Sequence, residues 1–150
     1  MKNDEVVVVD SNIMVKWFIP EEYSREAGRL LKGFLYGRIS IIAPVYAMIE
    51  CCNALRKYVV RKIISREQVM GVYRLFTRIG VNFVTIEQPL LEEALRYGLD
   101  NDITVYDAYY IVLAKHYDTI VYTADEKLLK KIGGVEASIR HIKDYELGQA

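Results

Sequence analysis

The chain has 150 residues, the size of one domain, and is long enough to bury a sizeable core without disulfides or a structural metal. Acidic and basic residues number 20 each, so the formal net charge is zero. This balance excludes a nucleic-acid-binding protein that is basic over its whole surface, and any RNA contact must rest on a local patch. We expect a single domain over residues 1–150.

The two cysteines, Cys51 and Cys52, are adjacent within a segment of helical periodicity. Neighbouring residues on a helix point in different directions, so we expect no disulfide between them, and a metal site would lack partners. Neither a signal peptide nor an apolar run of about 18 residues is visible, so no membrane span is expected. These features favour a protein of the reducing cytoplasm.

The first half of the chain alternates short apolar runs with amphipathic segments. Residues 6–9 form an unbroken run of valine, as expected for a strand covered on both faces. Residues 21–36 repeat apolar side chains at helical spacing, and Gly37 offers a natural end to that helix. A second strand is predicted over residues 39–43 and a helix over residues 44–61. The predicted inward face of this helix comprises Val45, Met48, Ile49, Cys52, Leu55 and Val59.

The second half continues the alternation. A helix is expected over residues 65–79 with Ser65 as its cap. The remaining predicted elements are a strand over 82–86, helices over 89–98 and 104–116, a strand over 119–123, a helix over 125–132 and an edge strand over 137–142. Strands that alternate with helices in this way predict an α/β fold with three layers, α/β/α, around a central, mostly parallel sheet of about five strands.

Four acidic residues occupy positions where parallel sheets form ligand sites. Asp10 ends the first strand, and Asp125 follows the predicted strand over residues 119–123 almost directly. Ligands bind outside the carboxyl ends of such strands. Asp107 lies in the first turn of the helix predicted to begin near Thr104, and Glu50 lies within the helix predicted over residues 44–61. None of the four belongs to the apolar stripe of its element, so all of them can converge although they are distant in sequence.

Each acid also has an ordinary structural explanation. Asp10 can cap the segment that starts at Ser11, and Asp125 can cap the helix at 126–131. Thr104 and Asp107 resemble a capping box, and Glu50 can be a solvated helix residue paired with a nearby basic side chain. Taken singly, each acid is better explained by such a structural role, because caps and exposed acids are common.

Convergence of the four carboxylates would demand a cation. Two carboxylates about 4 Å apart repel by roughly 4 kcal/mol at an effective dielectric constant of about 20. Without a cation the cluster would have to take up protons, at raised pKa values. Oxygen ligands without nearby histidine or cysteine favour Mg²⁺ or Mn²⁺. Such an ion can orient a phosphodiester, lower the pKa of a bound water and stabilise the leaving oxygen, so metal-assisted phosphodiester hydrolysis is the expected chemistry.

Four sequence blocks surround the acids and span nearly the whole chain. They are residues 7–12 (VVVDSN) with 16–22 (KWFIPEE), 43–44 (AP) with Glu50 and 53–56 (NALR), 104–110 (TVYDAYY) with 113–114 (LA), and 123–128 (TADEKL). In this order the blocks resemble those of PIN-domain proteins, and especially of VapC-type toxins. None of the four acidic positions departs from the family's pattern.

The resemblance implies a metal-dependent endoribonuclease that is the toxin of a toxin–antitoxin pair. By the resemblance, Asp10, Glu50, Asp107 and Asp125 hold one or two Mg²⁺ or Mn²⁺ ions that activate water for RNA cleavage. Asp10 and Asp107 would be direct ligands, whereas Glu50 and Asp125 would act partly through water. The resemblance also implies a homodimer and a small VapB-like antitoxin as partner.

Other residues are weaker candidates for the site. Ser11, Asn12 and Thr123 would support the acids by hydrogen bonds, although turn and cap chemistry explains them equally well. Lys57 shares the Glu50 side of its helix, and it could contact RNA phosphate together with Arg56. Surface lysines usually only solvate a helix, so both explanations stay open.

Two alternatives belong to other functional classes. One is a non-catalytic PIN-fold module that binds RNA or protein, but such a module has no need of four acids beside RNA. The other is a phosphoacceptor receiver domain, which is also a parallel α/β fold. A receiver domain should show paired acids after its first strand, whereas Asp10 stands alone before Ser11.

Overall fold

The apolar runs of the sequence form the strands of one sheet in the structure, a computed structural model that describes residues 5–145. The strands are β1 (Glu5–Val9), β2 (Ile39–Pro44), β3 (Asn82–Val84), β4 (Val121–Thr123) and β5 (Ile139–His141). The helices are α1 (Ser11–Lys16), α2 (Ser24–Leu35), α3 (Tyr46–Val60), α4 (Arg66–Arg78), α5 (Gln88–Asn101), α6 (Val105–His116), α7 (Glu126–Ile132) and a short 3₁₀ helix, η1 (Ile142–Asp144).

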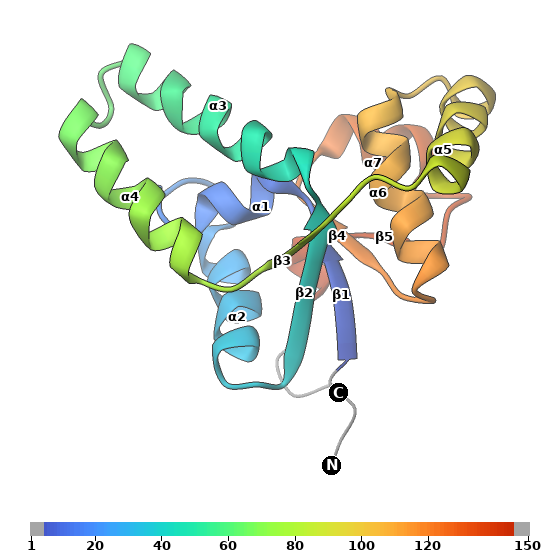
Figure 1. The fold of residues 1–150 in the computed structure, drawn as a ribbon, viewed down its shortest axis with the longest axis horizontal. Helices are drawn as coiled ribbons and strands as arrows, with labels where there is room; N and C mark the ends of the chain where they lie inside the picture. The colour runs from blue at the N-terminus through green and yellow to red at the C-terminus, as the bar shows by residue number, and fades with distance from the viewer. Residues whose placement is uncertain (1–4, 146–150) are drawn as a thin grey trace.

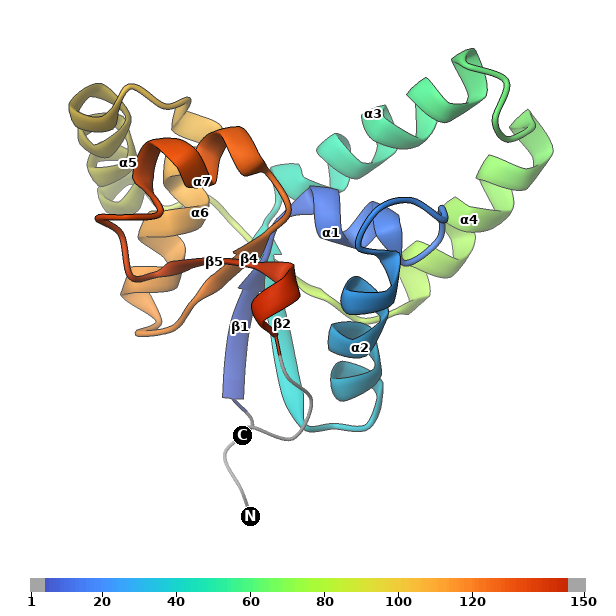
Figure 2. The same ribbon diagram turned by 180° about the vertical axis from the view of Figure 1, so that it is seen from behind.

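β1 lies in the middle of the sheet, whose strand order is β3-β2-β1-β4-β5. Every pairing among the described strands is parallel. The chain first winds from β1 to β3 with α1 to α4 on one face, then returns past β1 to β4 and β5 with α5 to α7 on the other (Figures 1 and 2). This confirms the predicted three-layer α/β/α class and shows that the winding reverses beside β1.

The core explains why β1 is a continuous apolar run. Val8 and Val9 have no exposed surface, because helices cover both faces of the central strand. Residues 108–114 of α6 are all buried, and this helix packs against β1, β2 and β4. Burial of each large apolar side chain contributes about 1.5–3 kcal/mol, so β1 and α6 anchor the fold.

Local capping signals predicted several helix boundaries correctly. Ser65 caps α4 through a capping box: its hydroxyl accepts from the Gln68 N–H (3.1 Å), and the Gln68 side chain accepts from the Ser65 N–H (2.9 Å). Gly37 follows α2 closely with φ +74°, a conformation that favours glycine. Pro89 lies in the first turn of α5, where its missing N–H loses no helical hydrogen bond.

The predicted end of α5 at Gly98 is wrong. The helix continues to Asn101, and Asp102 turns the chain with φ +52°. Gly98 is buried, and its carbonyl accepts a hydrogen bond from the Ile103 N–H (3.2 Å) as the chain folds back. A Cβ at Gly98 would lie 2.9 Å from the Ile103 carbonyl oxygen, so the close backbone approach, rather than a helix stop, explains the glycine.

The predicted inward face of α3 is also wrong in part. The buried residues of the helix are Ala47, Cys51 and Leu55. Val45, just before the helix, is 41% exposed, and Ile49 is 72% exposed. α1 packs against α3, and the small side chains of Ala47 and Cys51 suit such a close contact. The contact with α1, rather than the size of the apolar side chains, therefore determines which residues of α3 are buried.

Helices α3 and α4 form an arm that projects from the sheet (Figure 1). An apolar pocket of about 430 Å³ lies between them, with Leu55, Val59 and Val69 among its lining residues. The longest described helix is α3, with 15 residues. None of the helices within residues 5–145 is long and apolar enough to cross a membrane.

Replacement of Gly98 by alanine is expected to lower the free energy of unfolding by about 1–3 kcal/mol, because the added Cβ forces the connection after α5 to shift. Gly28→Ala in α2 is the matched control, since nothing lies within 4 Å of an added Cβ there. Its higher helix propensity should stabilise the protein by up to about 1 kcal/mol. Thermal unfolding followed by circular dichroism measures both, and equal melting temperatures would contradict the packing explanation.

Candidate active site

Asp10 is the most deeply buried of the four candidate acids, with 7% of its surface exposed directly after β1. Its carboxylate accepts three hydrogen bonds: Oδ2 from Thr123 Oγ1 (3.0 Å) and Asn12 Nδ2 (3.2 Å), and Oδ1 from Ser11 Oγ (3.3 Å). The side chain makes no capping bond to the start of α1. The structural alternative of a simple helix cap therefore does not explain Asp10.

A chain of hydrogen bonds joins Asp10 to Asp125. The Thr123 hydroxyl donates to Asp10 and accepts from the Asp125 N–H (3.0 Å) and from Asn12 Nδ2 (3.2 Å). Asp125 also caps α7, because its Oδ1 accepts from the Leu128 N–H (3.1 Å). Side chains thus link the carboxyl ends of β1 and β4, which already pair in the sheet.

Asp107 and Glu50 approach from α6 and α3. The Thr104 hydroxyl accepts from the Asp107 N–H (3.1 Å), which begins α6 and places Asp107 in its first turn. Nearly one turn further along, the Tyr110 hydroxyl donates to Glu50 Oε1 (2.8 Å). Glu50 forms no ion pair within the described chain, so the alternative of a solvated, paired helix acid is not what the structure contains. Tyr110, a buried residue of α6, thus contacts a candidate site residue directly.

A tyrosine cluster fixes α3 relative to α6. The Tyr46 ring packs edge-on against the rings of Tyr106, Tyr109 and Tyr110. Its hydroxyl donates to the Tyr106 carbonyl oxygen (2.6 Å). These contacts hold the first turn of α3 against the first turn of α6, and so hold Glu50 near Asp107.

Electrostatic effects connect the candidate acids with one another. Burial, together with the charges of Asp107 and Glu50, raises the pKa of Asp10 to about 7. Burial also raises the pKa of Asp107, and the charges of Asp125 and Glu50 act in the same direction. Like charges shift a carboxyl pKa in this way only when they are near. The fold therefore places these acids, which are distant in sequence, near enough for their charges to interact.

The chemistry of these residues suits a hard divalent cation. The donors are carboxylate oxygens, and the cluster holds negative charge that no basic side chain neutralises by an ion pair within residues 5–145. As the side chains stand, no three acidic, histidine or cysteine residues in that range converge closely enough to form a ready metal site. Asp10, Glu50, Asp107 and Asp125 are the residues that could hold Mg²⁺ or Mn²⁺.

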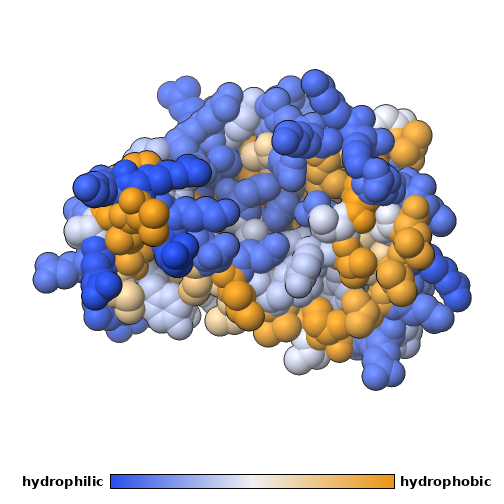
Figure 3. Space-filling view, turned by 90° about the horizontal axis from the view of Figure 1, so that it is seen from above, coloured by the Kyte–Doolittle hydropathy of each residue, from blue (hydrophilic) through white to orange (hydrophobic). Residues whose placement is uncertain are grey.

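A pocket of about 300 Å³ lies beside Asp107 and Asp125. Lys127 and Lys131 of α7 also line this pocket, and the sequence reasoning missed both. Their spacing of four residues, directly after Asp125, places them on one side of a helix and could have revealed them. Figure 3 views the molecule from the edge at which the strands end, and hydrophilic side chains occupy the middle of this face.

The two predicted substrate contacts lie further along α3. Arg56 lines the apolar pocket of the α3–α4 arm. Lys57 is exposed, and it follows Glu50 by seven residues, which is about 10 Å along a helix axis. Neither residue lines the pocket beside Asp107.

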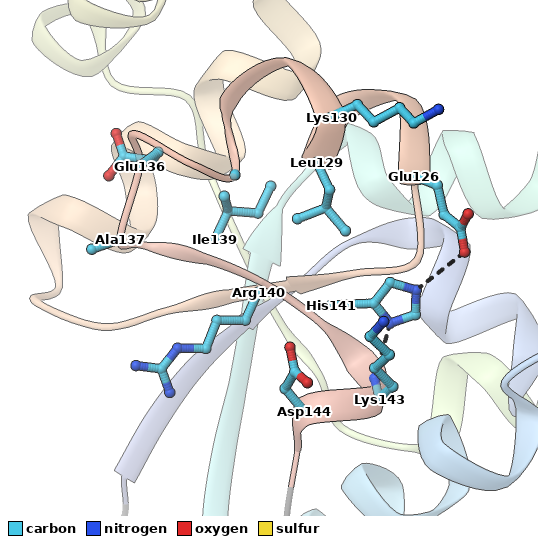
Figure 4. Close-up of a pocket in the computed structure, with 11 residues that line it drawn as sticks. Glu126, Leu129, Lys130, Glu136, Ala137, Ile139, Arg140, His141, Lys143 and Asp144 are labelled. Carbon is cyan, nitrogen blue, oxygen red and sulfur yellow. Dashed lines mark hydrogen bonds and ion pairs between the residues drawn. The ribbon is translucent and has the colours of Figure 1, made fainter.

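A larger pocket of about 790 Å³ lies along β5 and α7 (Figure 4). It contains none of the four acids. His141 Nε2 lies 3.7 Å from Glu126 Oε1, while the side chains of Lys130 and Arg140 extend away from His141. The labelled charges in this pocket do not converge on one point, so we assign no chemistry to it.

Comparison with solved structures supports the fold. PAE2754 from Pyrobaculum aerophilum superimposes with a TM-score of 0.63 at 21% identity, covering 94% of this chain and 93% of that chain. A toxin–antitoxin complex from Klebsiella pneumoniae gives a TM-score of 0.66 at 17% identity, covering 93% and 98%. VapC20 of Mycobacterium tuberculosis, a sarcin–ricin loop cleaving toxin, gives 0.63 at 12% identity, covering 89% and 98%.

Sequence comparison identifies the family. A search of curated proteins gave no significant match. The sequence model of the PIN domain, however, matches residues 7–135, a range that contains all four acids. Because this match covers most of the chain, the protein belongs to the PIN-domain family.

Proposed function

We propose that the protein is a metal-dependent endoribonuclease and the toxin of a toxin–antitoxin pair. The observation that carries this proposal is the cluster of Asp10, Glu50, Asp107 and Asp125, in which burial and neighbouring charge raise the pKa of Asp10 to about 7. The cluster lies at the carboxyl edge of a parallel sheet, beside the strand where the winding reverses. The likeness in fold to VapC20 and to a toxin–antitoxin complex supports the same class of function.

The side chains would divide the work of RNA hydrolysis. Asp10 and Asp107 would ligate Mg²⁺ or Mn²⁺ directly, whereas Glu50 and Asp125 would act partly through water. Bound there, the cation would supply Lewis acidity for the phosphodiester and a lowered pKa for the attacking water. Thr123 fixes the Asp10 carboxylate by its hydrogen bond, which favours one orientation of this ligand before the cation binds.

The proposed assembly follows from the family resemblance. We propose one domain over residues 1–150 that works in the cytoplasm as a homodimer, cuts RNA and is neutralised by a VapB-like antitoxin. Exposed apolar side chains support an interface between copies: Leu95 and Leu99 on α5 are 50% and 75% exposed, and Tyr106 at the start of α6 is 62% exposed. Hydrophobic groups gather toward the borders of the face in Figure 3.

Loss of either direct ligand is expected to abolish cleavage. Asp10→Asn and Asp107→Asn should each slow Mg²⁺- or Mn²⁺-dependent cleavage of a labelled RNA by at least about 100-fold, because each removes charge from the metal site. Asp100→Asn, the same change on the exposed side of α5, is the control and should cut at the wild-type rate. Wild-type rates for both site variants would refute the assignment. RNA binding by the wild type without any cleavage would favour a non-catalytic PIN-fold module.

Asp10 should also destabilise the metal-free protein above about pH 4. In the folded protein the Asp10 carboxyl group has a pKa of about 7, whereas its ordinary pKa is 3.8. Between these two pH values the folded protein therefore binds more protons than the unfolded chain. The free energy of unfolding therefore falls as pH rises through this range. In EDTA, Asp10→Asn should exceed the wild type in stability by about 1–4 kcal/mol near pH 8 and by little near pH 4.

Differential scanning calorimetry across this pH range measures the difference in stability. Saturating Mg²⁺ should raise the melting temperature of the wild type more than that of Asp10→Asn, because a cation offsets the charge of the ionised carboxylate. A pH-independent difference between the two proteins would contradict the proposed burial of the charge.

Toxicity is a separate expectation from catalysis. Induced expression in a bacterial host should arrest growth, and Asp10→Asn should relieve the arrest at an equal level of soluble protein. A short DNA-binding protein encoded next to this chain should restore growth when it is co-expressed. Normal growth with an active enzyme would reject the toxin role while leaving the nuclease assignment intact.

A further inference from the structure

The pocket beside Asp107 and Asp125 contains two lysines whose surroundings differ. It lies between the start of α6, the connection that precedes α6, and α7. Lys127 and Lys131 are separated by four residues, so they lie one turn apart on the same side of α7. Both line the pocket together with the two acids.

Lys131 is held by contacts with Asp102, in the turn between α5 and α6. Its Nζ lies 3.1 Å from the Asp102 carboxylate and also donates to the Asp102 carbonyl oxygen. Asp102 has φ +52°, a left-handed conformation that is unfavourable for a residue with a side chain. The lysine therefore ties α7 to the turn that leads into α6 and Asp107.

Lys127 makes no contact comparable to the Lys131–Asp102 ion pair. Its side chain is exposed, and within residues 5–145 it forms neither an ion pair nor a side-chain hydrogen bond. It shares the pocket with Asp107 and Asp125, and it follows Asp125 by two residues at the start of α7. Lys127 thus lines the same pocket as Asp107 and Asp125 without an ion pair of its own.

We propose that Lys127 binds an RNA backbone phosphate that flanks the bond to be cut; this inference rests on the proposed nuclease function. The four acids repel a polyanion, and the chain has a net charge of zero, so attraction of RNA must come from cations close to the site. A lysine ammonium is a compact point charge with three donors, which suits a phosphate oxygen without reading the base.

Lys130 provides a matched control on the same helix. It lines the pocket along β5 rather than the pocket beside Asp107, and Figure 4 shows its side chain extending away from His141. Like Lys127 it is exposed and forms no ion pair in the described part of the chain. Removal of either lysine changes the net charge by the same amount. A difference in RNA affinity between the two variants therefore reflects where the lysine lies, not the loss of charge in general.

The test is RNA binding by the full chain in an Asp10→Asn background, which keeps the probe intact. The probe is a fluorescein-labelled single-stranded RNA of mixed sequence, and anisotropy in Mg²⁺ is read at several salt concentrations. Lys127→Ala should weaken binding about 3- to 10-fold and lower the slope of log K against log salt by about 0.7, the value for one phosphate contact. Lys130→Ala should stay within about two-fold of its parent, and Lys127→Arg should retain the slope.

The outcomes separate this inference from the proposed function. Equal affinities and slopes for Lys127→Ala and Lys130→Ala, with RNA cleavage by the wild type, would overturn the role of Lys127 alone. Failure of the wild type to bind or cleave the probe would overturn the nuclease proposal and this inference with it. A melting temperature of Lys127→Ala equal to that of its parent excludes misfolding as the cause of weak binding.

Discussion

The uncompensated negative charge at the end of β1 is the constraint on which the site depends. Asp10 follows the central strand, next to the point where the winding of the chain reverses, so other elements meet around it. Burial favours a proton on its carboxyl group, as do the charges of Asp107 and Glu50, and its pKa rises to about 7. Near neutral pH the group lies between protonation and ionisation, and a bound cation would replace the proton. A fold optimised only for stability would place an apolar residue at this position.

The structural and catalytic explanations of the acids turn out to be compatible. Asp125 caps α7 with Oδ1 and lies in the cluster, and Asp107 sits in a helical turn that Thr104 begins. A cap fixes the backbone next to a carboxylate and restricts its side chain, which would prepare the residue for its proposed role as a ligand. Thr123 likewise contacts two of the acids with one hydroxyl group, which donates to the Asp10 carboxylate and accepts from the Asp125 N–H. Sequence reasoning on single residues could not choose between a structural role and a proposed catalytic role, because one residue can combine the two.

The fold was predictable wherever local chemistry is decisive. The valine run of β1 and the cap at Ser65 were sufficient for a central strand and a helix start. α1 was missed as a helix, because six residues give too short a period to recognise.

The position of Gly98 within α5 depends on contact with Ile103, which lies beyond the helix. The Tyr110–Glu50 hydrogen bond joins residues 60 positions apart, and no local pattern contains that information. Parallel topology indicated only that Asp10 and Asp125 can converge, and the family resemblance implied that Glu50 and Asp107 join them. The raised pKa of Asp10 depends on its burial, which the sequence does not show.

Apolar and basic side chains lie on different sides of the candidate site. The α3–α4 arm lines its pocket largely with apolar side chains, although Arg56 and Arg66 stand among them. On the opposite side, α7 places Lys127 and Lys131 in the same pocket as Asp107 and Asp125. A phosphate chain at this pocket would therefore meet the two lysines on its α7 side. Lys131 is held in the Asp102 ion pair, whereas Lys127 forms no ion pair among residues 5–145. A basic residue that serves the proposed site must therefore lie close to the acids, because the chain as a whole carries no net charge that would attract a polyanion.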